Sequence, residues 1–201
     1  MKIVDIDNIA YIGNHGLEIE WKHKKWVHPT ALKTQPKVKE ICRRIWRRAR
    51  HLPGVIIEDK GPSGSIHFRL LASHYTSSLR KIIHEEIQIS KDLLKLTEGK
   101  KVYEIRPRVD WDKGRGILKL LSWLNLNEKP FMIYLGDDQT DEDVFRILRR
   151  DNLTIRVGSL RRSLASFKLK NVSAAWQFLT SLERMISTPE QLLGRGSSRG
   201  A

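Results

Sequence analysis

A run of five apolar residues, FMIYL at 131–135, passes directly into the acidic segment GDDQTDED at 136–143. An apolar run without alternation is typical of a strand covered on both faces, as in a parallel sheet. The carboxyl ends of such strands are where open α/β proteins bind their ligands. The sequence therefore predicts an α/β fold with a polar site at the end of this strand.

The acidic segment carries five carboxylates in seven positions of a chain whose formal net charge is +14: Asp137, Asp138, Asp141, Glu142 and Asp143. Thr140 is the expected N-cap of a helix, and carboxylates in the first helical turn suit the helix dipole, which accounts for residues 141–143. Asp137 and Asp138 lie before that turn, where hard oxygen ligands suit Mg²⁺. We expect Asp137 to bind Mg²⁺, with Asp138 and Asp141 either as further ligands or as supports of the ligands.

The rest of the chain divides into two patterns. A buried strand is expected at 8–13. Residues 17–106 then read as ββαββαβ, a compact α+β unit, with a hairpin through 17–28, helices at 37–50 and 77–96, and strands at 55–59, 65–72 and 101–107. Strand–helix alternation follows, with helices at 113–124 and 171–186, strands at 131–135 and 153–158, and a helix after the acidic segment.

Composition limits the function classes. Of the 201 residues, 40% are apolar and 30% charged, as in globular proteins, and no apolar run approaches the ~18 residues of a membrane helix. The one cysteine, Cys42, excludes an internal disulfide and favours a reducing cytoplasm. The 37 basic against 23 acidic residues indicate an anionic partner, although arginine-rich runs such as 43–51 are also typical of a solvated helix face. Without a helix-turn-helix, zinc or aromatic-stacking signature, nucleic acid is not the expected partner.

Four segments resemble the trehalose-6-phosphate phosphatases, a branch of the haloacid dehalogenase superfamily. GDDQTDEDVF (136–145) resembles the fourth motif of that family. In matching order, the other three are YIGNHGLEIE (11–20), GVIIEDKG with HFR (54–61 and 67–69), and KVYEIRPRVDWDKG (101–114). The resemblance extends from about residue 8 to residue 185.

The resemblance implies part of a Rossmann-like core with an inserted α+β cap. Residues 1–16 would be a core strand leading to the cap, 17–106 the sugar-binding cap, 107–186 the second half of the core, and 187–201 a disordered tail. It also implies Mg²⁺-dependent hydrolysis of trehalose 6-phosphate through an aspartate nucleophile. Lys113 matches the third-motif lysine, whose ammonium offsets charge on the phosphoryl group.

Five further residues match positions that the family uses around the sugar: Glu58, Lys60, Glu104, Asn14 and His15. Carboxylates and an ammonium can hydrogen-bond several hydroxyls at once, as a neutral disaccharide requires. Taken without the resemblance, the cap residues are polar ends of edge strands, His15 is a hinge residue, and Lys113 is an exposed lysine at a helix start.

The sequence departs from the family at its beginning. The first motif, Asp-x-Asp-Gly-Thr, belongs well upstream of the Asn-His-Gly segment, yet thirteen residues precede Asn14. Asp5-x-Asp7 is followed by Asn8 and does not match, and the serine or threonine of the second motif has no counterpart. We therefore expect a chain that is inactive alone. It would be a fragment of a phosphatase, a chain that pairs with another polypeptide supplying the first part of the core, or a non-catalytic sugar-phosphate-binding remnant with a regulatory role.

Overall fold

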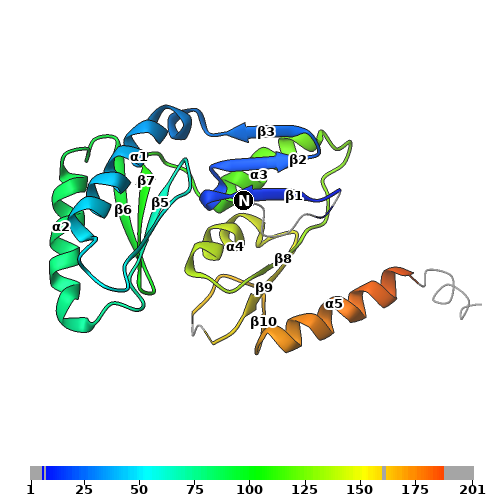
Figure 1. Ribbon diagram of the computed structural model, residues 1–201. Coiled ribbons are helices and arrows are strands. Elements are labelled where there is room, and N and C mark those ends of the chain that lie inside the picture. The colour runs from blue at the N-terminus through cyan, green and yellow to red at the C-terminus, as the bar shows by residue number, and fades with distance from the viewer. Residues whose placement is uncertain (1–5, 7, 160–161, 188–201) are drawn as a thin grey trace, which may run out of the picture. The chain divides into compact units, whose positions relative to one another are not determined.

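The structure is a computed structural model that describes residue 6, residues 8–159 and residues 162–187 (Figure 1). The chain forms two compact units, Met1–Asn125 and Leu126–Ala201, and each is described here by itself. The Asp5-x-Asp7 pair and residues 188–201 of the expected disordered tail lie outside the described residues. No helix among the described residues is both long enough and apolar enough to cross a membrane.

The first unit opens with a small antiparallel sheet in the order β1-β2-β3. Its strands are β1 (Ala10–Gly13), β2 (Glu18–Trp21) and β3 (Lys24–Val27), with the short helix η1 (Asn14–Gly16) between the first two. The predicted hairpin over 17–28 is confirmed as β2 and β3. The strand predicted at 8–13 is confirmed over Ala10–Gly13, but its predicted burial is wrong, because β1 is a half-buried edge strand that pairs with β2.

A second sheet of the first unit has four antiparallel strands in the order β4-β5-β7-β6. Its elements in chain order are α1 (Pro29–Ala49), β4 (Ile56–Asp59), β5 (Gly64–His67), η2 (Ser73–Tyr75), α2 (Thr76–Gln88), β6 (Leu94–Gly99) and β7 (Val102–Pro107). Helices α1 and α2 cover one face of this sheet (Figure 1). We call these elements the cap layer.

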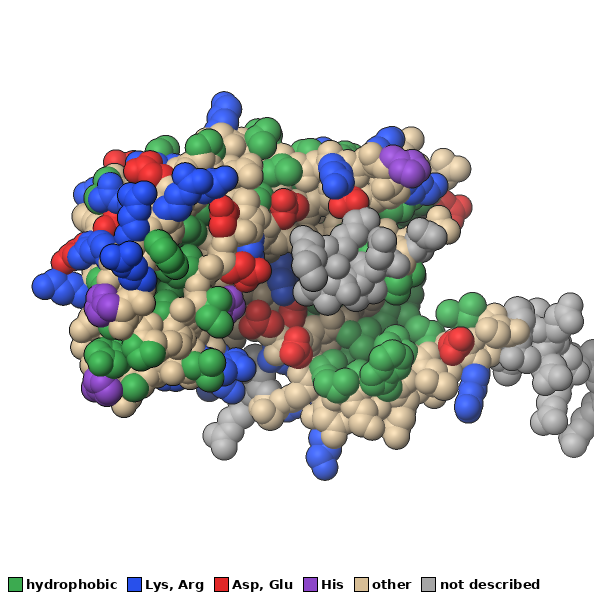
Figure 2. Space-filling model, in the orientation of Figure 1, with side chains coloured by type: hydrophobic (Ala, Val, Ile, Leu, Met, Phe, Trp, Pro, Cys, Tyr) green, Lys and Arg blue, Asp and Glu red, His purple; other side chains and the backbone are tan. Residues whose placement is uncertain are grey.

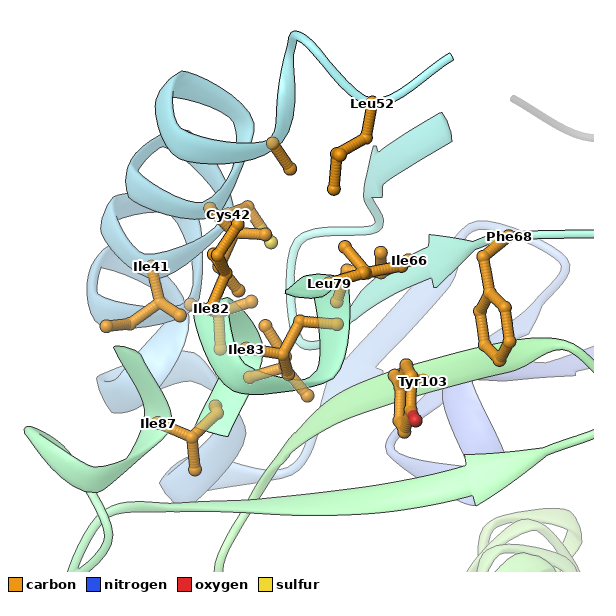
Figure 3. Packing of buried hydrophobic residues seen from close by; sticks show 14 of the residues in the cluster. Ile41, Cys42, Leu52, Ile66, Phe68, Leu79, Ile82, Ile83, Ile87 and Tyr103 are labelled. Carbon is orange, nitrogen blue, oxygen red and sulfur yellow. The ribbon is translucent and has the colours of Figure 1, made fainter. Parts of the chain in front are cut away.

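The helices of the cap layer bury the stripes that their sequences predict. Val38, Ile41, Cys42, Ile45 and Ala49 of α1 are buried, as are the predicted inward residues of α2, namely Leu79, Ile82, Ile83 and Ile87 (Figure 3). Helical spacing also places Trp46 on the apolar stripe of α1, but Trp46 is 54% exposed. The cluster is completed by apolar residues of the sheet, such as Ile66 and Ile105.

Three element boundaries of the cap layer differ clearly from the predicted ones, and the first is that the strand predicted at 65–72 is β5, which ends at His67. Helix α1 begins at Pro29, where His28 caps it by accepting the Thr30 N–H at 3.2 Å, and it continues through Pro36. Helix α2 ends at Gln88, where a helix to residue 96 was predicted. Leu94 and Leu96 instead belong to β6, which pairs with β7 along six residues, and this long-range pairing outweighs local helix propensity.

The arginine-rich part of α1 is partly neutralised within the cap layer. Arg44 donates to Glu86 at 2.6 Å, and Arg48 donates to Glu86 at 2.9 Å and to Glu85 at 2.5 Å. Burial of Glu86 would raise the pKa of its carboxyl, but the hydrogen bonds from Arg48 and Arg44 outweigh burial and lower the pKa. Figure 2 shows further lysine and arginine side chains gathered over this part of the surface.

The first unit ends with α3 (Lys113–Leu124), which matches the predicted helix. Its first turn approaches the η1 turn very closely. A Cβ added to Gly16 would lie 2.6 Å from the Asp112 carbonyl oxygen, and one added to Gly116 would lie 2.7 Å from the Gly16 Cα. Glycine at both positions therefore allows α3 to begin directly beside η1.

The second unit has three parallel strands in the order β10-β9-β8. Its elements are β8 (Ile133–Gly136), η3 (Gln139–Asp141), α4 (Glu142–Leu148), β9 (Leu153–Val157), β10 (Phe167–Leu169) and α5 (Val172–Ser187). The parallel sheet, β9 and the last helix were predicted, and β10 was not. Strand β8 was expected inside the sheet, but it is half-buried and lies at the edge of the described strands.

Candidate functional site

The η1 turn has an unusual backbone that projects two polar side chains. Asn14, His15 and Gly16 all have left-handed φ angles, of 49°, 57° and 88°. Side-chain residues other than Asn and Asp rarely adopt this conformation. The turn is held by the Trp111 indole, which donates to the Gly16 carbonyl oxygen at 2.7 Å.

His15 contacts Glu104 of β7, which lies 89 residues away in the sequence. His15 Nε2 is 2.6 Å from Glu104 Oε2, and both side chains are largely buried. The hydrogen bond from His15 lowers the pKa of the Glu104 carboxyl, although burial opposes it. His15 Nδ1 is buried and has no hydrogen-bond partner among the described residues, so a polar atom of the ring remains available.

Asn14 connects the same turn to the loop between β4 and β5. Its Nδ2 donates to the Glu18 carboxylate and, at 3.2 Å, to the Lys60 carbonyl oxygen. Its Oδ1 accepts from the Ser63 hydroxyl at 2.7 Å. These contacts fix the loop that carries Lys60 against η1.

The two candidate carboxylates of the cap layer, Glu58 and Glu104, stand in one row across the sheet. Glu58 of β4 pairs with Ser65 of β5, which pairs with Glu104 of β7. Directly paired residues of antiparallel strands project from the same face, so Glu58 and Glu104 share a face. Glu58 contacts Lys60 Nζ at 3.6 Å and His67 Nε2 at 3.3 Å. We call Asn14, His15, Glu58, Lys60 and Glu104 the polar row.

Lys113 is the first residue of α3, directly after the N-cap Asp112. The Asp112 carboxylate accepts the Arg115 N–H at 2.8 Å, which fixes the helix start. Lys113 is half-buried, and α3 packs against η1 through Gly16 and Gly116. An ammonium at this position adds to the positive end of the helix dipole.

In the second unit, the acidic segment forms a closed turn after β8. Asp138, not the predicted Thr140, is the N-cap of η3, and its carboxylate accepts the Gln139 N–H at 2.7 Å. Asp141 is buried, and its two oxygens accept from the Tyr134 hydroxyl and from the Asp138 N–H, each at 2.8 Å. Both carboxylates therefore shape the turn.

Arg156 of β9 anchors this turn through its backbone carbonyl groups. Its side chain is 5% exposed and donates to the Asp138 carbonyl oxygen at 2.8 Å and to the Asp137 carbonyl oxygen. It also lies 3.6 Å from Glu142, which accepts from Ser163 and from the Leu164 N–H. Glu142, expected in the first helical turn, is thus also a buried partner of an arginine.

The Asp137 carboxylate differs from those of its acidic neighbours in exposure and hydrogen bonding. Asp137 is exposed, and none of the hydrogen bonds found among the described residues uses its carboxylate. Within that part of the chain, no three His, Cys, Asp or Glu side chains converge to hold a metal. Exposed hard oxygens nevertheless suit Mg²⁺, which keeps several of its waters. The donor chemistry of this turn fits Mg²⁺: the Asp137 carboxylate is exposed, whereas the Asp138 and Asp141 carboxylates accept hydrogen bonds within the turn.

Sequence analysis did not identify several residues of these sites. Ser63 and Trp111 fix the η1 turn, Ser65 lies inside the row, and Tyr134 and Arg156 fix the acidic turn. Ser63, Trp111, Ser65 and Arg156 act through partners far along the chain or across a sheet, and Tyr134 reaches Asp141 only because the turn after β8 folds back. The single cue is Arg156, a charged residue between apolar neighbours in a predicted strand.

Comparison with known proteins gives a consistent result. A family model described as trehalose-phosphatase matches residues 1–177. Among curated proteins, the chain is 29% identical to trehalose-phosphate phosphatase B of Arabidopsis thaliana, over 95% of the chain and 54% of that protein. It is 31% identical to the probable trehalose-phosphate phosphatase E of Arabidopsis thaliana, over 95% of the chain and 57% of that protein. The chain thus spans about half the length of these relatives.

Solved structures agree on the fold. The crystal structure of a trehalose-6-phosphate phosphatase related protein matches with a TM-score of 0.74 at 22% identity, over 88% of this chain and 72% of that one. The C-terminal domain of the trehalose-6-phosphate phosphatase of C. albicans matches with a TM-score of 0.64 at 22% identity, over 87% of this chain and 70% of that one. At this identity the likeness shows the fold, which is the expected haloacid dehalogenase type.

Proposed function

The chain belongs to the trehalose-phosphatase family, and we propose that it is the sugar-binding and acidic-turn portion of a Mg²⁺-dependent trehalose-6-phosphate phosphatase. In this proposal, residues 17–106 form the cap, and residues 1–16 with 107–186 belong to the core. The reaction would release trehalose and phosphate, in the cytoplasm.

The polar row is the observation that carries this proposal. Asn14, His15, Lys60 and Glu104 come from three separate segments, yet direct hydrogen bonds link them. Such a row offers both donors and acceptors, and a disaccharide presents both kinds of partner through its hydroxyls. Glu104 is held ionised by His15, so it would accept hydrogen bonds from sugar hydroxyls at neutral pH.

The resemblance assigns Lys113 and Mg²⁺ to the phosphate end of the substrate. Mg²⁺ neutralises charge on a transferring phosphoryl group when it is bound. Asp137 would hold the ion, while the hydrogen bonds of Asp138, Asp141 and Arg156 keep the Asp137 backbone in place. Lys113 would offset the negative charge of the phosphoryl oxygens from the start of α3.

Turnover would require family residues for which no matching segment was found in this sequence, above all the aspartate nucleophile. We therefore expect the chain alone to bind sugar phosphate and to release no phosphate from it. A preceding segment or a separate polypeptide would supply the first motif. The alternative is a non-catalytic sugar-phosphate-binding remnant with a regulatory role, which is favoured by the use of both Asp141 oxygens inside the turn.

Binding is tested by titrating the full chain with trehalose 6-phosphate in the presence of Mg²⁺, using calorimetry. The double variant Glu58→Gln with Glu104→Gln should lose about tenfold or more in affinity, since each lost charge-assisted hydrogen bond costs about 1.5–3 kcal/mol. Glu183→Gln, an exposed glutamate of α5, is the matched control and should bind like the wild type. Unchanged affinity in the double variant would remove the polar row from the sugar site.

Catalysis is tested separately by phosphate release and by the coding sequence upstream of Met1. An in-frame or adjacent Asp-x-Asp-Gly-Thr motif, with phosphate release by the extended protein, supports the phosphatase. If the motif is missing and no phosphate is released with Mg²⁺, the non-catalytic alternative is supported. Release by the 201-residue chain alone would contradict the expectation that the nucleophile comes from elsewhere.

A further inference from the structure

A cavity of about 620 Å³ lies within the cap layer, where α2 begins and where β6 turns into β7. Its lining joins two aromatic rings, two cations and several hydroxyls: Phe68, Tyr103, Arg80, Lys101, Ser73 and Ser77, with Glu98, Thr76 and His74. The proposed function uses none of these residues.

The cavity and the polar row occupy opposite faces of β7. Tyr103 and Ile105 are buried against the helices, whereas Glu104 between them points to the other face. Tyr103 lines the cavity, and Glu104 contacts His15. A ligand in the cavity would therefore be separated from the polar row by the sheet itself.

The floor of the cavity is aromatic and has a polar atom without a partner. The rings of Phe68 and Tyr103 stack with centroids 5.0 Å apart and planes 19° apart, and Figure 3 shows them side by side at the edge of the buried cluster. Tyr103 is 2% exposed, yet none of the hydrogen bonds among the described residues involves its hydroxyl. The hydroxyl oxygen itself is not buried, so a ligand or solvent atom in the cavity can meet it.

The rim of the cavity supplies donors. The helical stretch starts at η2, and neither its N-cap Ala72 nor Tyr75, the N-cap of α2, provides a side-chain acceptor for the first N–H groups. The hydroxyls of Ser73 and Ser77 lie at this same end. An uncapped helix start with adjacent hydroxyls favours an anion.

Two cations, Arg80 and Lys101, complete the rim of the cavity, and Lys101 contacts the Phe68 ring of the floor. Lys101 Nζ lies 5.7 Å from the Phe68 ring centroid, over the ring, and Arg80 projects from the first turns of α2. Glu98, which pairs with Tyr103 in the sheet, is the one carboxylate of the lining. The lining thus carries two positive charges against one negative charge, with His74 in addition.

We propose that this cavity binds a small-molecule phosphate monoester. A phosphate dianion has three terminal oxygens, which match Arg80, Lys101 and the donors at the start of η2. Its organic part would lie against the Phe68 and Tyr103 side chains at the floor of the cavity, and the Tyr103 hydroxyl would donate to an ester or phosphate oxygen. The site is independent of the polar row and of the acidic turn.

The test is a ¹H–¹⁵N NMR titration of the full chain with phenyl phosphate at constant ionic strength, with phenol as the uncharged control. Saturating shifts are expected at residues 73–77 and 98–103 with phenyl phosphate, and much weaker ones with phenol. Because the readout is residue by residue, any binding near Glu104 or Lys113 is recorded separately. No saturable shift at residues 73–77, or equal binding of phenol, would overturn the proposal.

Matched variants separate a built site from the general positive charge of the chain. Arg80→Gln with Lys101→Gln should weaken binding about tenfold or more, because two charge-assisted contacts are lost. Lys81→Gln with Lys100→Gln removes equal charge from neighbouring exposed positions outside the lining, and its affinity should stay within about twofold of wild type. Equal losses in the two double variants would overturn the proposal.

Two single variants sharpen the assignment further. Glu98→Gln removes the one carboxylate of the lining and should strengthen phenyl phosphate binding severalfold. Tyr103→Phe keeps the stacked ring and should weaken binding severalfold, because one hydrogen bond is lost. Weaker binding in the Glu98 variant, or unchanged binding in the Tyr103 variant, would contradict the proposed contacts.

Discussion

The cap layer and the second unit solve the burial of apolar surface differently. In the cap layer, an antiparallel sheet buries one face against α1 and α2, and its apolar residues form one continuous cluster (Figure 3). In the second unit, Ile155 and Val157 of β9 are buried, but α5 leaves Trp176, Met185 and Ile186 exposed. An antiparallel sheet can leave one face to solvent, whereas a parallel sheet is normally covered on both. The cap layer is therefore the part of the described chain that is most complete as a folded core.

The two parts also differ in how their polar residues are held. The polar row depends on contacts between residues far apart in the sequence, such as His15 with Glu104. The acidic turn is largely closed by its own residues, Asp138 and Asp141, with Arg156 as its distant anchor. Three substitutions test these differences, from the largest expected effect to the smallest.

The largest effect is expected in the buried cluster of the cap layer. Ile83→Ala removes a side chain that is fully buried and should lower the free energy of unfolding by about 2–5 kcal/mol. Ile186→Ala, at a position of α5 that is 68% exposed, should change it by less than about 0.5 kcal/mol. Urea denaturation measures both. A large loss of unfolding free energy in the Ile186 variant would show that α5 is covered in solution. It would contradict the proposed difference between the cap layer and the second unit.

A smaller effect is expected at the anchor of the acidic turn. Arg156→Met leaves the Asp137 and Asp138 carbonyl oxygens without a donor and Glu142 without its cation. The free energy of unfolding should fall by about 2 kcal/mol. The amide resonances of residues 137–143 should shift, while those of the cap layer should not. Arg156→Lys keeps the charge and should lose less, and unchanged 137–143 resonances in Arg156→Met would refute the anchor role.

The smallest effect is the pH dependence of the His15–Glu104 contact. The folded pKa of Glu104 is lowered from its unfolded value of about 4.3, so its stabilisation is complete above that pH. It is lost as the pH falls through the lower folded pKa. His15→Asn tolerates the left-handed backbone but removes the imidazole. The Glu104 pKa should then rise toward its unfolded value, with a loss of about 1 kcal/mol at neutral pH.

The control for this titration is an exposed pair of the second unit. The Asp151 carboxyl accepts from Lys129 at 2.6 Å, and that hydrogen bond lowers its pKa. Both side chains are exposed, so high salt should return the Asp151 pKa toward its usual value. The Glu104 pKa should respond less to salt because its pair is largely buried. Equal salt responses, read by ¹³C NMR of the carboxyls, would contradict the difference between the two pairs.

The sequence predicted most elements but grouped some of them wrongly. The helix at 113–124, the last helix and the parallel pairing of β8 with β9 were predicted from local periodicity. The first hairpin was assigned to the cap sheet, yet it pairs with β1 in a sheet of its own. Strand β6 was predicted as helix, because a short apolar stretch fits both periods and only its partner β7 decides between them.

The candidate site divides in the same way. Residue types and order along the chain were enough to indicate the family, Lys113 and the acidic turn. The roles assigned to Lys113, Asp137 and the polar row remain predictions for the binding and release experiments. The different surroundings of Asp137 and Asp141 could not be predicted, since both are aspartates of one short segment and differ through Tyr134 and the fold of the turn.

By itself, the sequence determined the strands and helices with strong periodicity and the family to which the chain belongs, because both are written in local residue order. The tertiary structure alone decided which strands share a sheet, which carboxylates face inward, and that Tyr103 and Glu104 serve opposite faces of one strand. These outcomes depend on the free energy of strand pairing and burial between distant segments, which the local sequence does not determine.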